Sequence, residues 1–428
     1  MAAPSHTPVV VLGNLPWNDQ WRRRQYLFSH LARFRDVYHL DPPFPLLDFL
    51  RRGPASCGED PPGLPAGHPG PPGRSRAGAS PGRPQTGLPP AIRRGVSFAA
   101  WLATPWSIRT DASGVRVVRG RPALPGERFS PEARRINAAL HRGWARASLR
   151  RLAERHGVRK PVLVCYDALI HPLDLDGLVC QRVYDLIDDY PVIAGAARLQ
   201  KALEQKIHGL ARASDLTLVP NEALAVRVAG SARRVEVLPH GVDIACFHPE
   251  AYRGTVFEGL KRMPGPKAVY HGTLDDKLDT DILEALLREG IVLLLAGQTA
   301  WPAKRFAQLK RAGDLRCFGV LTPRNAGALV AAADAGILPY RPFRGHERGG
   351  VLKYLEFCAA GLPVVATDIA PCRRCGEELI LAGETRAFVA ATIAAARTGV
   401  EGRERRLALA RQNTWEERAR QLNGWLAP

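Results

Sequence analysis

The chain has 428 residues, of which 46% are hydrophobic and 24% charged, and its formal net charge is +19. This length predicts two or three domains, each with a sizeable apolar core. No apolar run approaches the roughly 18 residues of a membrane span, and the N-terminus lacks the pattern of a signal peptide. The eight cysteines are scattered, as is typical of reduced thiols in a cytosolic protein. We therefore expect a cytoplasmic protein.

Of the 60 basic residues, 51 are arginines, and two explanations of this charge stay open. It can reflect the base composition of a GC-rich genome, or it can attract anionic partners such as lipid headgroups and phosphosugars. No zinc-finger, RNA-binding or helix-turn-helix pattern accompanies the charge, so we expect no nucleic acid partner. An anionic membrane surface, such as the inner face of the cytoplasmic membrane, is the preferred functional explanation.

The first half of the chain begins with a predicted strand over residues 9–13, a helix over 19–34 and a strand over 37–40. This is the βαβ opening of a parallel sheet. Residues 51–95 are dense in Pro, Gly, Ser and Arg and cannot form a core, so we predict a disordered insertion. The later elements are strands at 115–118, 162–165, 182–184, 216–219 and 235–238, and helices at 131–156 and 195–212.

The second half opens with a turn-rich hinge at residues 238–249. A second βα series follows, with strands at 268–271, 291–296, 315–318, 335–338 and 364–367, and a last helix at 415–426. Two consecutive series joined by a hinge predict an α/β protein with two Rossmann-like, doubly wound domains that face a cleft.

The most informative motif lies at residues 336–368. A strand ends at Leu338, a basic loop containing Gly349 and Gly350 follows, and a short helix begins near Val351 and stops at Gly361. Two glycines let a backbone approach a ligand closely, and the first amides of the helix, at Val351 and Leu352, suit a phosphate.

Lys353 and Glu356 share one face of this helix, because they are three residues apart. That face can hold a cation for a phosphate and a carboxylate for a ribose diol. The opposite face, with Leu352, Leu355 and Ala359, is predicted to meet the core. The alternative is an ordinary strand-loop-helix-strand unit with a solvated Lys–Glu pair.

This motif, closed by AAGLPVVAT at 359–367, resembles the nucleotide-sugar signature of retaining, family-4-like GT-B glycosyltransferases. Residues 17–25 (WNDQWRRRQ) and 183–190 (VYDLIDDY) are similar to elements of bacterial enzymes of teichuronic-acid and exopolysaccharide assembly. Residues 239–243 (PHGVD) and 270–279 (YHGTLDDKLD) resemble their hinge and the first strand-loop of their donor domain. The helix that begins at Trp415 resembles the terminal helix that returns to the first domain.

The resemblance implies an acceptor domain at 1–239, a donor domain at 240–411 and a returning helix at 412–428. It implies sugar transfer, with retention, from a nucleoside diphosphate sugar to a saccharide or lipid-linked saccharide of the cell surface. No cofactor beyond the donor substrate is expected. Sequence names neither the base, the sugar, the acceptor nor the linkage.

On the donor side, negative charge builds on the departing diphosphate during transfer, so cations and amides must stabilise it. The candidates are Gly272, Lys277, Gly349, Gly350, Val351, Leu352 and Lys353, with Glu356 on the ribose. We expect no metal, because the Asp-x-Asp triplets at 174–176 and 279–281 end no clear strand. Asp279 is instead predicted to cap a helix.

On the acceptor side, Asp188 and Asp189 follow a strand, and side chains adjacent in sequence point apart, so one of them is expected to face the cleft. It can orient acceptor hydroxyls or act as a base, or the pair can cap a helix. Trp17 and Trp21 can form a sugar platform or pack the first helix, and Arg23 can meet an anionic acceptor. Asn14 and His240 complete the acceptor-side candidates.

Two departures from the family pattern concern the donor site. Arg348, next to Glu347, stands where the family has its first Glu, and Thr273 stands where it has an Arg after Gly272. The missing first Glu makes a non-catalytic sugar-binding relative possible. A second alternative, a nucleotide-sugar epimerase, stays open because other enzymes have the same fold.

Overall fold

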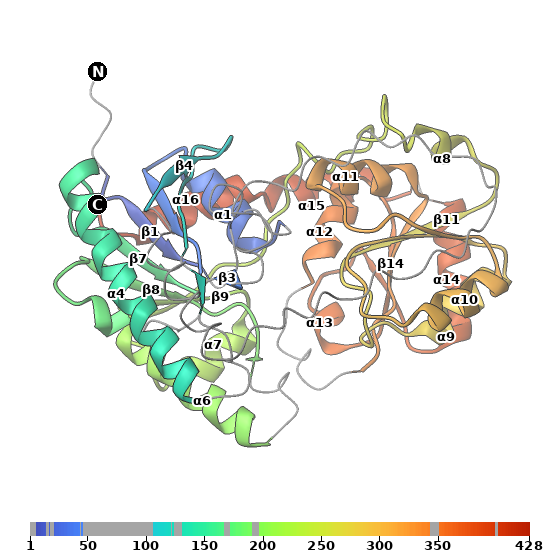
Figure 1. Cartoon of the computed structure of the whole chain (residues 1–428). Coiled ribbons are helices and arrows are strands. Elements are labelled where there is room, and N and C mark those ends of the chain that lie inside the picture. Colours follow the sequence, from blue (N-terminus) through green and yellow to red (C-terminus); the bar gives the residue numbers. More distant parts are fainter. Residues whose placement is uncertain are drawn as a thin grey trace, which may run out of the picture.

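The computed structural model describes residues 6–13, 17, 21–42, 44–45, 106–120, 122–123, 131–166, 172–190, 197–342, 351–398 and 401–428. These residues form two α/β bodies that lie side by side (Figure 1). The predicted insertion at 51–95 lies outside the described residues. None of the described helices is both long and apolar enough to cross a lipid bilayer.

The first body is built on an eight-stranded sheet with the order β10-β9-β8-β7-β1-β2-β5-β4. All of its pairings are parallel except that of β4 with β5. The strands are β1 (Val9–Leu12), β2 (Val37–Leu40), β4 (Ile108–Thr110), β5 (Arg116–Val118), β7 (Val162–Cys165), β8 (Gln181–Asp185), β9 (Leu216–Val219) and β10 (Val235–Val237). The short strands β3 (Phe44–Pro45) and β6 (Pro122–Ala123) pair with each other.

The central strands β1, β2, β7 and β9 are buried along their whole length, as expected of a parallel sheet covered on both faces. The helices of this body are α1 (Arg23–Leu31), α4 (Pro131–His156), α6 (Ala197–Ala213) and α7 (Glu222–Val228), with the 3-10 turn η1 (Pro172–Leu175). The last helix of the chain, α16 (Trp415–Trp425), lies against α1 (Figure 1). There the rings of Tyr26 and Trp415 stack at 5.7 Å.

The second body has a six-stranded parallel sheet with the order β13-β12-β11-β14-β15-β16. Its strands are β11 (Lys267–His271), β12 (Val292–Ala296), β13 (Leu315–Cys317), β14 (Ala335–Leu338), β15 (Val364–Thr367) and β16 (Leu379–Ala382). Its helices are α8 (Glu258–Arg262), α9 (Thr280–Arg288), α10 (Ala303–Ala312), α11 (Pro323–Ala332), α12 (Leu352–Ala359), α13 (Ala370–Arg373), α14 (Thr385–Arg397) and α15 (Arg403–Gln412). Strand order reverses between β11 and β14, and ligands of such sheets bind outside the carboxyl ends of the strands at this point.

The predicted fold class is confirmed, since both bodies are doubly wound α/β units. The predicted strands at 37–40, 162–165, 216–219, 335–338 and 364–367 match observed strands residue for residue. The edge strand β16 was missed, because its two central residues are exposed and leave no continuous apolar run. The domain boundaries at 239 and 411 stay predictions.

Helix α12 stops as predicted. Gly361 has a φ of +76°, and the amide of Leu362 donates to the carbonyl of Phe357 at 3.0 Å, an arrangement that glycine permits. The predicted core face is wrong in part, because Leu352 and Leu355 are only partly buried. The face that meets the core carries Tyr354, Phe357 and Cys358, with Ala359, while Leu352 packs against the core of the first body.

Candidate active site

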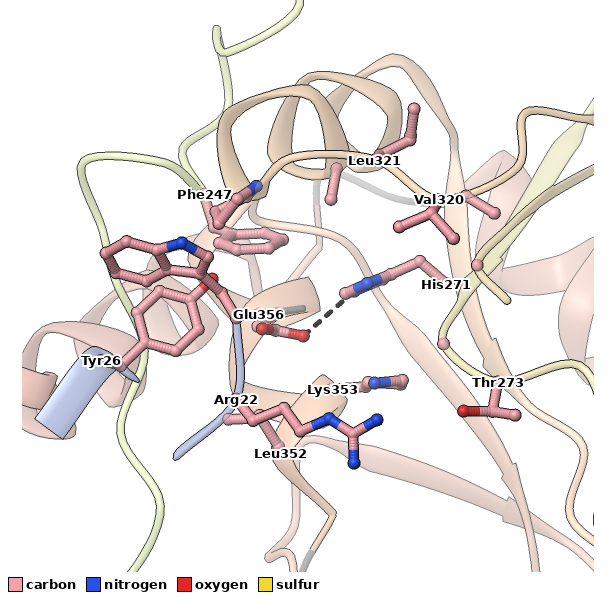
Figure 2. A pocket seen from close by; sticks show the side chains of 16 residues that line it. Arg22, Tyr26, Phe247, His271, Thr273, Val320, Leu321, Leu352, Lys353 and Glu356 are labelled. Atoms are coloured by element: carbon pink, nitrogen blue, oxygen red, sulfur yellow. Dashed lines mark ion pairs between the residues drawn. The ribbon is translucent and has the colours of Figure 1, made fainter. Parts of the chain in front are cut away.

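A cleft of about 270 Å³ lies between the two bodies, at the carboxyl ends of β11 and β12 (Figure 2). The first body contributes Trp21, Arg22 and Tyr26 to its lining. The second body contributes Phe247, His271, Gly272, Thr273, Ala296, Gly297, Val320, Leu321, Pro323, Ala326, Leu352, Lys353 and Glu356. The cleft therefore lies next to the point where the strand order reverses, where a ligand is expected.

Two glycines shape the floor of this cleft. A Cβ added to Gly297 would lie 1.8 Å from the carbonyl oxygen of Gly272, so the loops after β11 and β12 touch through their backbones. Gly272 has a φ of +140°, and a Cβ there would lie 2.3 Å from the Cε atom of Lys353. Gly272 thus leaves the space through which the Lys353 side chain reaches the cleft.

Glu356 lies at the base of the cleft and is only 4% exposed. Its Oε2 atom lies 3.0 Å from Nε2 of His271, a contact that Figure 2 shows as a dashed line. Burial by itself would raise the pKa of Glu356, but His271 and the Lys353 ammonium hold that pKa below its ordinary value. Glu356 is therefore ionised at neutral pH.

The imidazole of His271 is held between two aromatic rings. Its centroid lies 5.6 Å from that of Phe247, in a stacked arrangement, and 5.6 Å from that of Phe357, edge to face. This packing fixes the ring against the Glu356 carboxylate.

Lys353 projects into the same cleft from the first turn of α12 (Figure 2). Burial lowers the pKa of Lys353, Arg22 lowers it further, and Glu356 opposes both. In the described part of the chain, no side chain caps the N-terminus of α12 at Val351. The first amides of a helix can meet an anion, and here this end of the helix lies beside the Lys353 ammonium.

The other donor-side candidates are placed differently. Lys277 is not among the residues that line the cleft; its side chain is 40% exposed, and its Nζ lies 3.8 Å from Oδ2 of Asp275. The expectation that Lys277 and Lys353 act together in one site therefore lacks support in their placement. Gly349, Gly350 and Asn14 lie outside the described residues.

The two tryptophans separate. Trp21 is 38% exposed and lines the cleft, whereas Trp17 is 2% exposed and its indole N–H donates to the carboxylate of Asp111. The predicted sugar platform is therefore corrected to Trp21 alone. Trp17 serves the alternative that the sequence left open, which is packing within the first body.

The expectation that Arg23 meets an anionic acceptor is wrong. Its side chain is 3% exposed, its Nε lies 3.2 Å from Oδ2 of Asp185, and its Nη1 donates to the carbonyl of Leu238 at 2.8 Å. All of these partners lie inside the first body. Arg23 therefore holds the start of α1 against the ends of β8 and β10.

Asp188 and Asp189 point apart, as expected of neighbours after a strand. Asp189 is buried and its Oδ1 lies 3.2 Å from Nε of Arg227, so it belongs to the interior of the first body. Asp188 is partly buried, and burial raises its pKa to about 6, although the cations of Lys277 and Arg22 oppose the shift. Asp188 is therefore close enough to Lys277 of the second body and to Arg22 for their charges to act on it, but it is not among the residues that line the cleft.

His240, the remaining acceptor-side candidate, does not line this cleft. Its ring lies edge-on to Trp415 at 6.2 Å. Burial lowers the pKa of His240 to about 3, and the cations of Arg23 and Lys353 contribute. His240 is therefore neutral at physiological pH.

Sequence reasoning missed Arg22, Tyr26, Phe247 and His271. Arg22 was hidden beside Arg23, and only the direction of each side chain tells them apart. His271 ends a buried strand just before Gly272, and its position there was a usable signal. The predicted role of Asp279 as a helix cap is confirmed, because its side chain accepts from the amide of Asp281. No group of three His, Cys, Asp or Glu among the described residues is placed to hold a metal ion.

Comparisons with known proteins agree with this architecture. The family described as Glycosyl transferases group 1 matches residues 269–398, and no curated protein matches the chain. Sucrose-phosphate synthase from Thermosynechococcus elongatus has a TM-score of 0.64 at 14% identity, over 98% of both chains. Anabaena Alr3699/HepE, in complex with UDP and glucose, has a TM-score of 0.60 at 12% identity, over 97% of this chain and 98% of that one.

A third solved structure, entitled "Trehalose-6-phosphate from E. coli bound with UDP-2-fluoro glucose", has a TM-score of 0.61 at 12% identity, over 97% of this chain and 98% of that one. At these identities, the likeness concerns the fold. The matched residues begin within β11 and include β12 to β15 and α12, and these elements build most of the cleft. Residues 269–398 therefore match a glycosyl transferases group 1 domain, and the chain as a whole shares the fold of these solved structures.

Proposed function

We propose that this protein transfers a sugar, with retention, from a nucleoside diphosphate sugar to a saccharide or lipid-linked saccharide acceptor. The observation that carries the proposal is the cleft between the bodies, where an ionised Glu356 and the Lys353 ammonium lie on one face of α12. A nucleoside diphosphate needs both groups, a carboxylate for the ribose hydroxyls and a cation for the phosphates.

The donor fits this cleft in three parts. Glu356, held by His271, accepts hydrogen bonds from the ribose diol, and Lys353 with the first amides of α12 binds the diphosphate. Phe247, Val320 and Leu321 form an apolar wall suited to a planar base. As the glycosidic bond breaks, charge grows on the diphosphate, and the fixed ammonium stabilises it.

The acceptor enters from the first body, in this proposal. Trp21 offers an exposed indole at the cleft, and Asp188 offers a carboxylate that changes charge near pH 6. Such a group can orient an acceptor hydroxyl or receive its proton. A role in cell-surface polysaccharide synthesis at the inner face of the cytoplasmic membrane rests on the family resemblance and on the charge of +19. Retention rests on the same resemblance.

The test is nucleoside diphosphate release from a panel of UDP-, GDP- and ADP-sugars, with and without added saccharides. UDP-sugars come first, since the two relatives named with a ligand carry UDP or a UDP-sugar. We expect release with one class of donor, and a loss of at least tenfold in turnover for Lys353→Ala at saturating donor. Lys310→Ala, on α10, is the matched control.

Binding without release from any donor would identify a sugar-binding relative instead of a transferase. Nuclear magnetic resonance of the product reports the anomeric configuration, and inversion would remove the proposed stereochemistry. A turnover of Lys353→Ala within a few-fold of the wild type would remove the Lys353 ammonium from stabilisation of the leaving group.

A further inference from the structure

We infer that Arg22 is the second cation of the donor site, so that one diphosphate is held by both bodies at once. The inference rests on the proposed function and goes beyond it, because it assigns a donor contact to the first body. Arg22 and Lys353 come from different bodies and line the same cleft, and Figure 2 shows both side chains directed into it.

The position of Arg22 is fixed by its neighbour in sequence. Arg23 is clamped by Asp185 and by the carbonyls of Leu238 and Pro239. Because adjacent residues at the start of a helix point in different directions, this clamp turns Arg22 toward the cleft. Tyr26, one turn further along α1, stacks on Trp415 and braces the same end of the helix.

The charges of this region are unbalanced in a way that suits an anion. In the described part of the chain, neither the Arg22 guanidinium nor the Lys353 ammonium has a carboxylate oxygen within 4.0 Å. The two cations are close enough for Arg22 to depress the pKa of Lys353. Like charges that face each other in a partly dehydrated cleft repel, and an anion between them removes the repulsion.

Among the described residues, Arg22 and Lys353 are the cations that line this cleft, and Asp188, outside the lining, is the carboxylate on which Arg22 acts. Thr273 lines the same end of the cleft but is uncharged, and Lys277 stays outside the lining beside Asp275. A diphosphate carries two to three negative charges and presents oxygens on both sides. It therefore matches a guanidinium from α1 on one side and an ammonium from α12 on the other.

The test is calorimetric titration of the full chain with UDP, GDP and ADP and with the matching nucleosides. Using the diphosphate that binds the wild type best, we expect Arg22→Gln to raise its Kd at least tenfold and to leave the nucleoside affinity unchanged. The double variant Arg22→Gln with Lys353→Gln should lose less than the two single losses combined, because both residues serve one ligand group. Arg288→Gln, an exposed arginine of α9 paired with Glu284, is the control.

Unchanged diphosphate affinity in a folded Arg22→Gln variant would overturn the inference while leaving the proposed function intact. An equal loss of nucleoside affinity would also overturn it, because the effect would not then depend on phosphate charge. Arg22→Lys keeps the charge and should recover part of the affinity. A wild-type protein that binds none of the three diphosphates would instead overturn the proposed function itself.

Discussion

Both bodies are doubly wound α/β units, but their charged side chains serve different purposes. In the first body, Arg23 pairs with Asp185 and Asp189 pairs with Arg227, away from the cleft, and Arg22 is the charged residue that lines it. In the second body, Lys353 and the Glu356–His271 pair line the cleft. Charged residues near a switch point can therefore hold a fold together or meet a ligand, and motif likeness alone does not separate the two roles.

The largest expected effect tests whether the buried Arg23–Asp185 pair stabilises the first body. Arg23→Ala leaves the buried Asp185 carboxylate without its cation, so the free energy of unfolding should fall by about 3–5 kcal/mol. Urea unfolding of the full chain measures the change. The control is Arg33→Ala in the same region, since Arg33 and its partner Glu416 are exposed and such a pair is worth at most about 1 kcal/mol.

Equal stability of the Arg23 and Arg33 variants would show that the buried pair contributes nothing and would reopen a ligand-binding role for Arg23. The prediction of a ligand-binding role for Arg23 rested on its position in a motif, which gives no direction for the side chain. That direction depends on where α1 meets β8, which no local pattern encodes.

Most strands of the fold could be predicted from the sequence for a physical reason. Strands such as β9 and β15 are short apolar runs buried on both faces, and that pattern is visible in the sequence. The exposed edge strand β16 and short helices such as α13 depend on their neighbours, so they were missed. In the candidate site, the spacing of Lys353 and Glu356 predicted that they share one helix face. His271 and Arg22 come to the cleft through tertiary packing, which the sequence pattern does not show.

The second prediction tests whether the charged residues of the second body bind the ligand. If the Glu356 carboxylate accepts from the ribose hydroxyls, Glu356→Gln should raise the Kd of a nucleoside diphosphate tenfold to a hundredfold, about 1.5–3 kcal/mol for charged hydrogen bonds. The nucleoside alone should weaken by a similar factor, unlike its behaviour with Arg22→Gln. Calorimetry measures both, with the exposed Glu416→Gln as control.

Unaltered nucleoside affinity in that variant would remove Glu356 from the ribose. In this case the His271 contact would be an internal pair like those of the first body, and the contrast between the two bodies would weaken.

The third prediction concerns Asp188, whose carboxylate can affect both the stability of the fold and the reaction. Its folded pKa of about 6 exceeds the usual value of 3.8, so the folded state binds the proton more tightly than the unfolded state. Stability should therefore fall as pH rises from about 4 to 7, by about 1–2 kcal/mol after allowance for residual solvation. Asp188→Asn should remove this dependence, being more stable than the wild type at pH 8 and equal to it at pH 4.

Activity should change in the opposite direction. If the ionised carboxylate serves the acceptor, kcat/KM should rise with pH through about 6, and this limb should vanish in Asp188→Asn. If Asp188→Asn is more stable but its kcat/KM still rises with pH through about 6, then the Asp188 carboxylate destabilises the fold and takes no part in catalysis.

The smallest expected effect tests how the cleft positions its ammonium. Gly272→Ala places a methyl group where the Lys353 Cε atom passes, and the flexible lysine end, not the backbone, is the part that can move. The φ of +140° adds strain of about 1–2 kcal/mol, so the protein should still fold. Diphosphate affinity should drop several-fold. In a Lys353→Ala background the same substitution should change affinity little, because the 2.3 Å clash with the lysine is gone and the next atom, the Tyr270 hydroxyl oxygen, lies 3.0 Å away. Calorimetry on the four proteins of this cycle measures the coupling. Equal losses in both backgrounds would mean that Gly272 acts through its own backbone at the ligand and not by admitting Lys353, and the ammonium would then owe its position to α12 alone.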